Sequence, residues 1–144
     1  LSLRRQRQMC IRDRSDMSPK EARKQLGPNA IIGLSIESLE EVIVANQLKD
    51  LNYIAASAIF PSKTKLNCKT YWGLAGLKEV TQLSHHPVVA IGGIETSNIS
   101  DVMEQGAVGV AIVSAIHDHQ DPESISKVFI EKINKTLLER KKHA

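Results

Sequence analysis

The chain has 144 residues, 42% of them apolar, which is enough for one globular domain with a hydrophobic core. Its low aromatic content (3%), two cysteines and lack of any apolar run near about 18 residues exclude an aromatic nucleic-acid-stacking surface, a disulfide scaffold and a membrane-spanning helix. The net charge of +3 is concentrated at the two ends, so residues 15–134 carry a net charge of −4. We therefore expect a cytoplasmic protein without a nucleic-acid or membrane partner.

The first fourteen residues, LSLRRQRQMCIRDR, show neither helical nor strand periodicity. Arginines interrupt every apolar stretch, so the segment is not a secretory signal. One interpretation is an arginine-rich tail that binds an acidic partner. We favour another, because QRQMCIRDR resembles a translated sequencing adapter: residues 1–14 are a non-native or disordered head, and the natural protein extends further upstream.

From Ser18 onward, helix signals alternate with short β-branched strands, which is typical of an α/β protein with parallel strands. Two capping boxes begin helices, Ser18-Pro19-Lys20-Glu21 and Ser38-Leu39-Glu40-Glu41, and Gly27-Pro28 ends the first. In the second helix the apolar face is Leu39, Val42, Ala45 and Leu48. Further helices are predicted at 73–83, around 99–103 with an end at Gly106, and from Asp121-Pro122 onward, the last with Ile125, Val128, Phe129, Ile133 and Leu137 on one face.

Four strands are predicted between these helices, over residues 30–35, 53–60, 87–91 and 109–116. Each is followed by a helix, and one more helix precedes the first strand. Four such units could form a small open sheet, but they also equal half of an eight-stranded (β/α)8 TIM barrel. We therefore expect residues 15–144 to be roughly the C-terminal half of a TIM barrel.

In either architecture, functional residues gather at the carboxyl ends of the strands. The residues predicted there are Ser35, Pro61-Ser62-Lys63-Thr64-Lys65, Gly92-Gly93 and Val113-Ser114. Hydroxyls, lysines and glycines are the residue types that hold phosphate groups, through hydroxyl donors, ammonium charge and backbone N–H groups. The pattern therefore indicates a phosphate-binding site without a protein nucleophile. The triplet His117-Asp118-His119 is an alternative metal site, although a solvated loop is the simpler explanation.

Five segments together carry a resemblance to a known family: GPNAIIGLS, SLEE, IFPSKTK, PVVAIGGI and GVAIVSAI. In this order and spacing they resemble thiamine-phosphate synthase, from about Asp16 to the final helix. The resemblance implies a β/α barrel that condenses 4-amino-2-methyl-5-(diphosphooxymethyl)pyrimidine with thiazole phosphate, giving thiamine phosphate and pyrophosphate. The family's first half, with its pyrimidine-binding segment and first magnesium aspartate, has no counterpart here.

The resemblance also assigns roles to individual residues. Asp16 corresponds to a ligand of Mg²⁺, and Ser35 and Lys65 to residues that contact the diphosphate. The thiazole phosphate would be held by Ser62, Lys63, Thr64, Gly93, Val113 and Ser114. One departure is Ile36-Glu37, where the family usually has Thr-His.

These residue types suit the chemistry, because a lysine and Mg²⁺ stabilise the negative charge that grows on a departing diphosphate. The implied partners are small-molecule substrates, and a homo-oligomer is left open. Two alternatives remain: a thiazole tautomerase of similar sequence, which needs no magnesium, and a non-catalytic phosphate-binding or nucleic-acid-binding module that uses the arginine-rich head. We further expect the present chain to be inactive by itself and prone to associate, since half a barrel leaves two open sheet edges.

Overall fold

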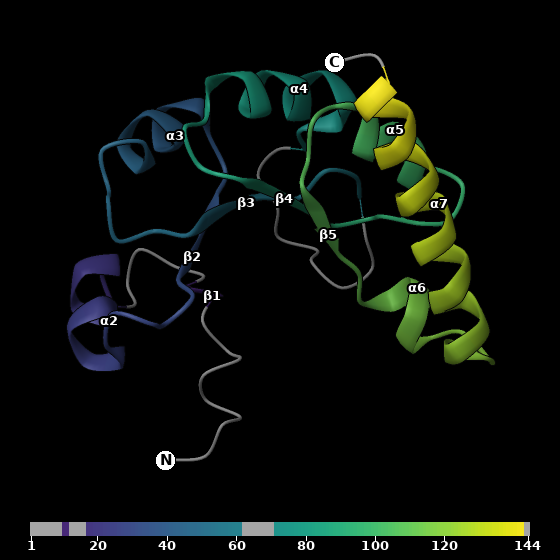
Figure 1. Cartoon of the computed structure of the whole chain (residues 1–144), viewed down its shortest axis with the longest axis horizontal. Coiled ribbons are helices and arrows are strands. Elements are labelled where there is room, and N and C mark those ends of the chain that lie inside the picture. The colour runs from purple at the N-terminus through teal and green to yellow at the C-terminus, as the bar shows by residue number, and fades with distance from the viewer. Residues whose placement is uncertain (1–9, 12–16, 62–70, 143–144) are drawn as a thin grey trace.

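A computed structural model describes residues 10–11, 17–61 and 71–142, and within them the chain alternates strands with helices (Figure 1). In chain order, the first six elements are β1 (Cys10–Ile11), α2 (Pro19–Leu26), β2 (Gly33–Ile36), α3 (Leu39–Ala45), β3 (Tyr53–Ser57) and α4 (Gly73–Leu83). The remaining elements are β4 (Val88–Ile91), α5 (Ile99–Glu104), β5 (Gly109–Ala111), α6 (Ser114–His117) and α7 (Pro122–Lys142). The predicted α/β class is confirmed.

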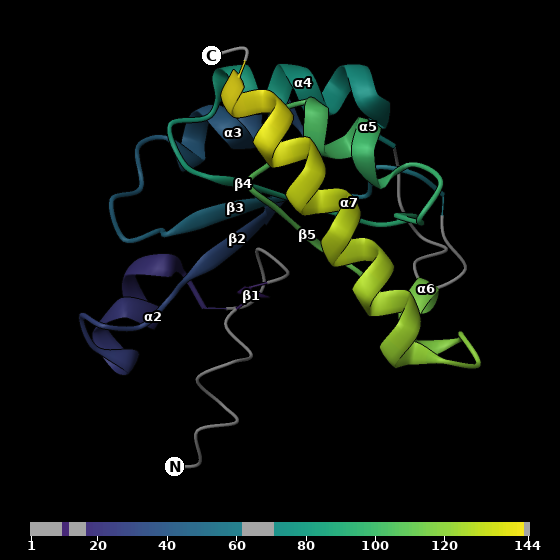
Figure 2. The ribbon, with the colours of Figure 1, turned by 45° about the vertical axis from the view of Figure 1, so that its right-hand side comes forward.

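The strands form one parallel sheet whose spatial order follows the chain, β1-β2-β3-β4-β5. Helices α3, α4, α5 and α7 lie on the outer, convex side of the arched sheet (Figures 1 and 2). A doubly wound sheet would have helices on both faces and a reversal in strand order. Sequential order with helices on one side is instead the arrangement of a barrel segment, as predicted.

The hydrophobic core lies between the sheet and the outer helices. Strand side chains alternate between faces, and Ile36, Ile54, Ala56, Val88 and Ala90 on the helix side are at most 3% exposed. The helices contribute further buried residues, namely Val42, Leu77, Val80, Ile99, Val102, Met103 and Phe129. This layer fixes the sheet and therefore the positions of the loops that follow each strand.

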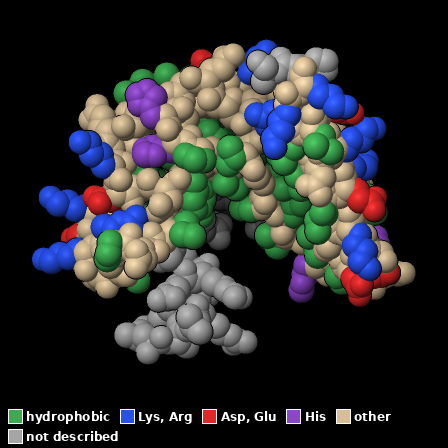
Figure 3. Space-filling model, in the orientation of Figure 1, with side chains coloured by type: hydrophobic (Ala, Val, Ile, Leu, Met, Phe, Trp, Pro, Cys, Tyr) green, Lys and Arg blue, Asp and Glu red, His purple; other side chains and the backbone are tan. Residues whose placement is uncertain are grey.

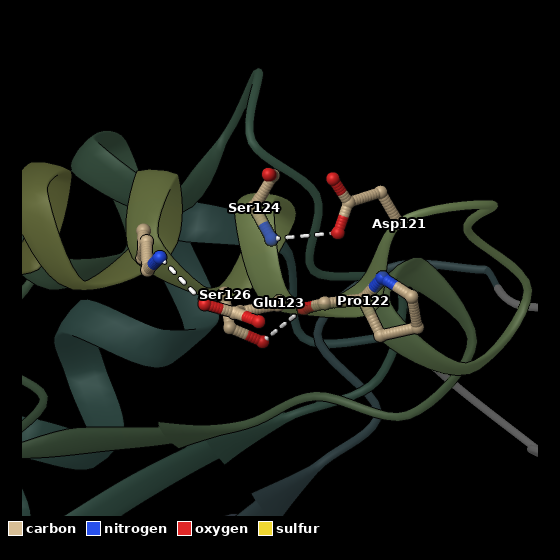
Figure 4. A network of polar contacts seen from close by, with 6 residues as sticks. Asp121, Pro122, Glu123, Ser124 and Ser126 are labelled. Atoms are coloured by element: carbon tan, nitrogen blue, oxygen red, sulfur yellow. Dashed lines mark hydrogen bonds and ion pairs between the residues drawn. The ribbon is translucent and has the colours of Figure 1, made fainter.

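The helix ends follow their sequence signals. Ser18 caps α2 through a complete capping box with Glu21, and Ser38 caps α3 by accepting from the backbone N–H of Glu41. At the start of α7, Asp121 Oδ1 accepts from the backbone N–H of Ser124 at 3.1 Å, and Ser126 Oγ donates to the Pro122 carbonyl (Figure 4). The contacts of Ser18, Ser38 and Asp121 satisfy backbone N–H groups that the first turn of a helix leaves without a partner.

Several details differ from the prediction: the first strand begins at Gly33 and not at residue 30, and the second ends at Ser57 and not at residue 60. Cys10–Ile11 forms a short strand that pairs with β2, although the arginine-rich segment around it shows no strand pattern. The last predicted strand ends at Ala111 and not at Ile116, because residues 114–117 turn into the short helix α6. Val128, expected on the buried face of α7, is 37% exposed, whereas Thr136 on that helix is buried.

The part of the chain that the structure describes contains no helix long and apolar enough to cross a membrane.

Candidate active site

Three of the predicted site segments lie where parallel strands end. Ser35 is in the last half of β2, Gly92–Gly93 follows β4 directly, and Val113–Ser114 lies at the junction between β5 and α6. The structure therefore brings these segments to the carboxyl-terminal rim of one sheet. Asp16, Ser62, Lys63, Thr64 and Lys65 lie outside the described residues.

The Gly92–Gly93 turn is the best-defined part of the rim. Both glycines have positive φ, 102° and 64°, which side chains disfavour. A Cβ on Gly93 would come within 2.7 Å of Phe60 Cβ and of the Pro61 carbonyl oxygen, and a Cβ on Gly92 within 2.6 Å of Ala58 Cβ. Glycine is therefore required at both positions, by backbone conformation and by the close approach of the segment after β3.

Hydrogen bonds hold this turn against the end of β3. The backbone N–H groups of Ile59 and Phe60 donate to the carbonyls of Ile91 and Gly92, both at 3.0 Å. Phe60 and Pro61 directly precede the predicted lysine loop. The Gly-Gly turn is thus hydrogen-bonded to the segment that leads into that loop.

Asn98 is a contributor to the rim that the sequence analysis missed. Its side-chain Nδ2 donates to the Gly93 carbonyl at 3.0 Å, and its Oδ1 accepts from the backbone N–H of Glu95 at 2.9 Å. The Lys132 ammonium on α7 also holds this loop, by donating to the Thr96 carbonyl at 2.8 Å. An asparagine before a helix is a known capping signal, but this one bonds backward to the loop and does not cap α5.

Ser35 lies on the inner face of the sheet. It pairs in register with Ala55 of β3, and Ala55 pairs with Val89 of β4. The next residue, Ile36, points to the other face and belongs to the core beneath the helices. Ile36 is fully buried there. This burial explains why an apolar residue fits at position 36, where the family usually has threonine. Glu37 is exposed, and its backbone N–H donates to Glu41 Oε2 at 2.7 Å.

At the β5 end, the backbone tightens into a helical turn. The Val113 carbonyl accepts from the N–H of His117 at 2.8 Å, and the Ser114 carbonyl accepts from the N–H of Asp118 at 2.9 Å. Val113 is 54% exposed although it is apolar. This turn places Ser114 at the first position of α6, three residues after the last residue of β5.

The side chains of His119 and His86 make their hydrogen bonds away from this rim. His119 Nδ1 lies 3.0 Å from the Asp121 carbonyl and 3.1 Å from its backbone nitrogen, so it closes a local turn before α7. Across the described segments, no three His, Cys, Asp or Glu side chains are grouped as metal ligands would be. His86 lies at the other end of the sheet, where its Nε2 is 2.9 Å from the Ala45 carbonyl, as its position before β4 predicts.

The inner side of the arch is hollow and lined by apolar side chains in the orientation of Figure 3. Polar groups suited to phosphate therefore lie at the rim of an apolar concavity. A parallel β/α arc whose glycine and serine segments lie at its carboxyl-terminal rim defines the class: a protein of the β/α-barrel type.

Comparison with known proteins narrows this class to one family. A family model described as thiamine monophosphate synthase matches residues 13–116, so the chain belongs to that family. It is 45% identical over 116 residues to the thiamine-phosphate synthase of Vibrio campbellii, and 46% identical over 101 residues to that of Persephonella marina. These matches cover 81% and 70% of this chain, but 56% and 47% of the relatives. The chain thus spans about half the length of the curated relatives it matches.

Solved structures agree with this assignment. The thiamine phosphate pyrophosphorylase of Pyrococcus furiosus superimposes with a TM-score of 0.78 at 31% identity, over 89% of this chain and 59% of that protein. A 3-hexulose-6-phosphate synthase gives a TM-score of 0.60 at 15% identity, which shows the fold alone. The barrel-type fold expected from the strand–helix alternation is thereby confirmed.

Proposed function

We propose that this chain supplies the thiazole phosphate half, and part of the pyrimidine diphosphate half, of a thiamine-phosphate synthase site. The reaction would join 4-amino-2-methyl-5-(diphosphooxymethyl)pyrimidine to thiazole phosphate, with release of pyrophosphate. The observation that carries the proposal is the placement of Ser35, Gly93 and Ser114 at one rim of a family-matched β/α arc. We also propose a cytoplasmic transferase that acts on small molecules and whose barrel domain includes residues 15–144.

The thiazole phosphate side would be built from residues of this chain alone. The fixed turn at Gly93 and the start of α6 at Ser114 offer backbone N–H and hydroxyl donors to phosphate oxygens. Val113 would contact the apolar part of the ligand. Ser62, Lys63 and Thr64, in the loop that follows Pro61, would complete this side with two hydroxyls and an ammonium group.

The diphosphate side would use Ser35 and Lys65, with Asp16 as the residue here that holds Mg²⁺. A carboxylate oxygen is the type of ligand that Mg²⁺ prefers, and the bound ion would neutralise charge on the diphosphate. The Lys65 ammonium would stabilise the negative charge that develops as the bond between carbon and diphosphate oxygen breaks. The thiazole nitrogen then forms the new bond to the pyrimidine methylene, so the protein's task is to orient two substrates and no side-chain nucleophile is needed.

Binding of the thiazole partner tests the proposal on the chain as it stands. Titration with 4-methyl-5-(2-phosphooxyethyl)thiazole, followed by calorimetry and by the amide resonances of Gly93 and Ser114, should give saturable binding. The dephosphorylated thiazole should bind much more weakly, because phosphate contacts supply most of the recognition. Equal affinity for both compounds, or no binding at all, would contradict the assignment of this rim.

Catalysis can be tested in a hybrid that joins this chain to the half of the Vibrio campbellii enzyme that it does not match. We expect Mg²⁺-dependent formation of thiamine phosphate, reduced about 100-fold or more by Lys65→Ala. Lys49→Ala removes an exposed lysine far from the rim and should have no effect. Undiminished activity in Lys65→Ala would overturn the role of Lys65, and isomerisation of the thiazole without the pyrimidine would favour a tautomerase.

A further inference from the structure

The Gly92–Gly93 turn poses a physical problem for a phosphate site. Glycine is the residue with the most backbone freedom, so two in succession would be expected to lose much conformational entropy when a ligand fixes them. A site that binds well must avoid most of this cost at binding, which requires the turn to be held in place beforehand. The hydrogen bonds around the turn show how this chain meets that requirement.

Each peptide group of the turn is held through its carbonyl oxygen. The Gly92 carbonyl accepts from the backbone N–H of Phe60 at 3.0 Å, which fixes the peptide between Gly92 and Gly93. The Gly93 carbonyl accepts from Asn98 Nδ2 at 3.0 Å, which fixes the peptide between Gly93 and Ile94. Both peptides are trans, so the N–H of each points in the opposite direction to its carbonyl. Fixing the two carbonyls therefore also fixes the directions of the Gly93 and Ile94 N–H groups.

Asn98 is itself held in position. Its Oδ1 accepts from the backbone N–H of Glu95 at 2.9 Å, and the Glu95 carbonyl accepts in return from the N–H of Asn98 and of Ile99. The side chain therefore bridges the start and the middle of the loop between β4 and α5. Both functional ends of the amide are used within the loop, so this side chain ties the Gly93 carbonyl to the Glu95 N–H.

We propose that Asn98 is a positioning residue of the phosphate site: by holding the Gly93 carbonyl, it fixes the Gly93 backbone in the conformation that binds the phosphate group. Asn98 does not touch the ligand in this role. The inference rests on the proposed function, because it assumes that Gly93 faces the phosphate of the thiazole partner. It goes beyond that function because Asn98 would control the affinity for the thiazole phosphate without contacting it.

A second asparagine provides a matched control. Asn46 bridges two backbone groups in the same manner, with Nδ2 donating to the Leu83 carbonyl at 2.9 Å and Oδ1 accepting from the N–H of His85 at 2.8 Å. This bridge lies before β4, at the opposite end of the sheet from Gly93. Asn46→Ala and Asn98→Ala remove equivalent hydrogen bonds, and they differ in which end of the sheet they loosen.

The first measurement needs no ligand. Amide hydrogen exchange and ¹⁵N relaxation of Gly93 and Ile94 should show faster exchange and greater mobility in Asn98→Ala than in the unsubstituted chain or in Asn46→Ala. Asn98→Asp keeps an acceptor for the Glu95 N–H but cannot donate to the Gly93 carbonyl, so it should loosen Gly93 as Asn98→Ala does. Gly93 amides that are equally ordered in all variants would overturn the proposal.

The second measurement is the affinity for 4-methyl-5-(2-phosphooxyethyl)thiazole. We expect Asn98→Ala to bind roughly tenfold more weakly and Asn46→Ala to bind as the unsubstituted chain does. Equal affinity in both variants would refute the role of Asn98 while leaving the proposed function intact. If the unsubstituted chain fails to bind the compound, the proposed function fails, and the mobility measurement alone decides whether Asn98 holds the turn.

Discussion

At the scale of single residues, Gly33 in β2 is fixed by the side chain beside it. The Tyr53 ring lies over this glycine, so a Cβ at position 33 would come within 2.1 Å of Tyr53 Cζ. We expect Gly33→Ala to lower the free energy of unfolding by about 1–3 kcal/mol, because the ring must leave its place on the sheet. Chemical denaturation at one fixed protein concentration measures this loss.

Gly109 in β5 serves as the control for Gly33, because nothing lies within 4 Å of a Cβ placed there. Gly109→Ala should be neutral or slightly stabilising, since it removes backbone freedom from the unfolded chain. The double variant Gly33→Ala, Tyr53→Ala should lose less stability than the two single losses added together. Simple additivity would show that the ring is not the cause.

Asp121, which caps α7, makes the stability of that helix depend on pH. Hydrogen bonds from Ser124 lower the pKa of the Asp121 carboxyl below its ordinary value of 3.8. A lowered pKa in the folded state means that the ionised carboxylate stabilises the fold at neutral pH, and that this contribution disappears as the pH falls through the folded-state pKa. Asp121→Asn keeps an oxygen that can cap the helix and removes the titration.

Thermal melts of the unsubstituted chain and of the Asp121→Asn variant across pH measure this contribution. The Tm of the unsubstituted chain should exceed that of the variant most near neutral pH, where the carboxylate also interacts with the positive end of the helix dipole. This excess should shrink steadily on acidification below pH 3.8. A difference in Tm that stays constant over this range would exclude the carboxylate as its source.

The site residues differ in how far sequence alone could place them. Ser35, Gly93 and Ser114 could be assigned to the same rim, because parallel strands joined by helices put their carboxyl ends at one edge of the sheet. Asn98 could not be assigned, since its two hydrogen bonds depend on the conformation of the loop between β4 and α5. Propensity marks asparagine as a capping residue, but which backbone group it reaches is a tertiary property.

At the scale of elements, Arg140 on the long helix α7 forms hydrogen bonds to the end of α5, against which α7 packs. The Arg140 guanidinium donates from Nη1 to the carbonyls of Met103 and Ala107, both at 3.0 Å, at the end of α5. These carbonyls belong to a helix terminus and to the loop after it, which need partners from outside the helix. Arg140 therefore joins two packed helices and satisfies backbone acceptors near the core.

We expect Arg140→Met to destabilise the fold by about 1–2 kcal/mol, because methionine retains much of the aliphatic packing and loses both hydrogen bonds. Lys141→Met is the control, as Lys141 is exposed on the next position of the same helix. It should change stability by less than about 0.5 kcal/mol. Urea denaturation of the two variants compares them, and equal losses would mean that Arg140 acts only through its charge.

Element boundaries were predicted well where a local signal exists. Ser18, Ser38 and Asp121 each cap the helix that they were expected to begin. The change from β5 to α6 was missed, because residues 110–116 form a nearly unbroken apolar run and a four-residue helix is too short to show a 3.6-residue period. Cys10–Ile11 was missed for the opposite reason: its pairing with Gly33 and Leu34 comes from the neighbouring strand and not from its own sequence.

At the scale of the whole molecule, the described sheet ends in two unpaired edges. Its order places β1 at one edge and β5 at the other, and parallel edge strands present N–H and C=O groups that can pair with another chain. The inner side of the arch adds an apolar surface, which Figure 3 shows as a hollow lined with hydrophobic side chains. Exposed apolar area next to open strand edges favours association.

We therefore expect the chain to self-associate at micromolar concentrations, with a sedimentation coefficient that rises with concentration. Val113, at the carboxyl end of the edge strand β5, is 54% exposed, and Val44, on the outer helix α3, is 55% exposed. A lysine at either position introduces the same charge at the same exposure, so only location differs. Val113→Lys should reduce association because the charge would have to be buried between chains, whereas Val44→Lys should leave it unchanged. A concentration-independent monomer, or equal effects of the two substitutions, would show that the open side of the sheet does not drive association.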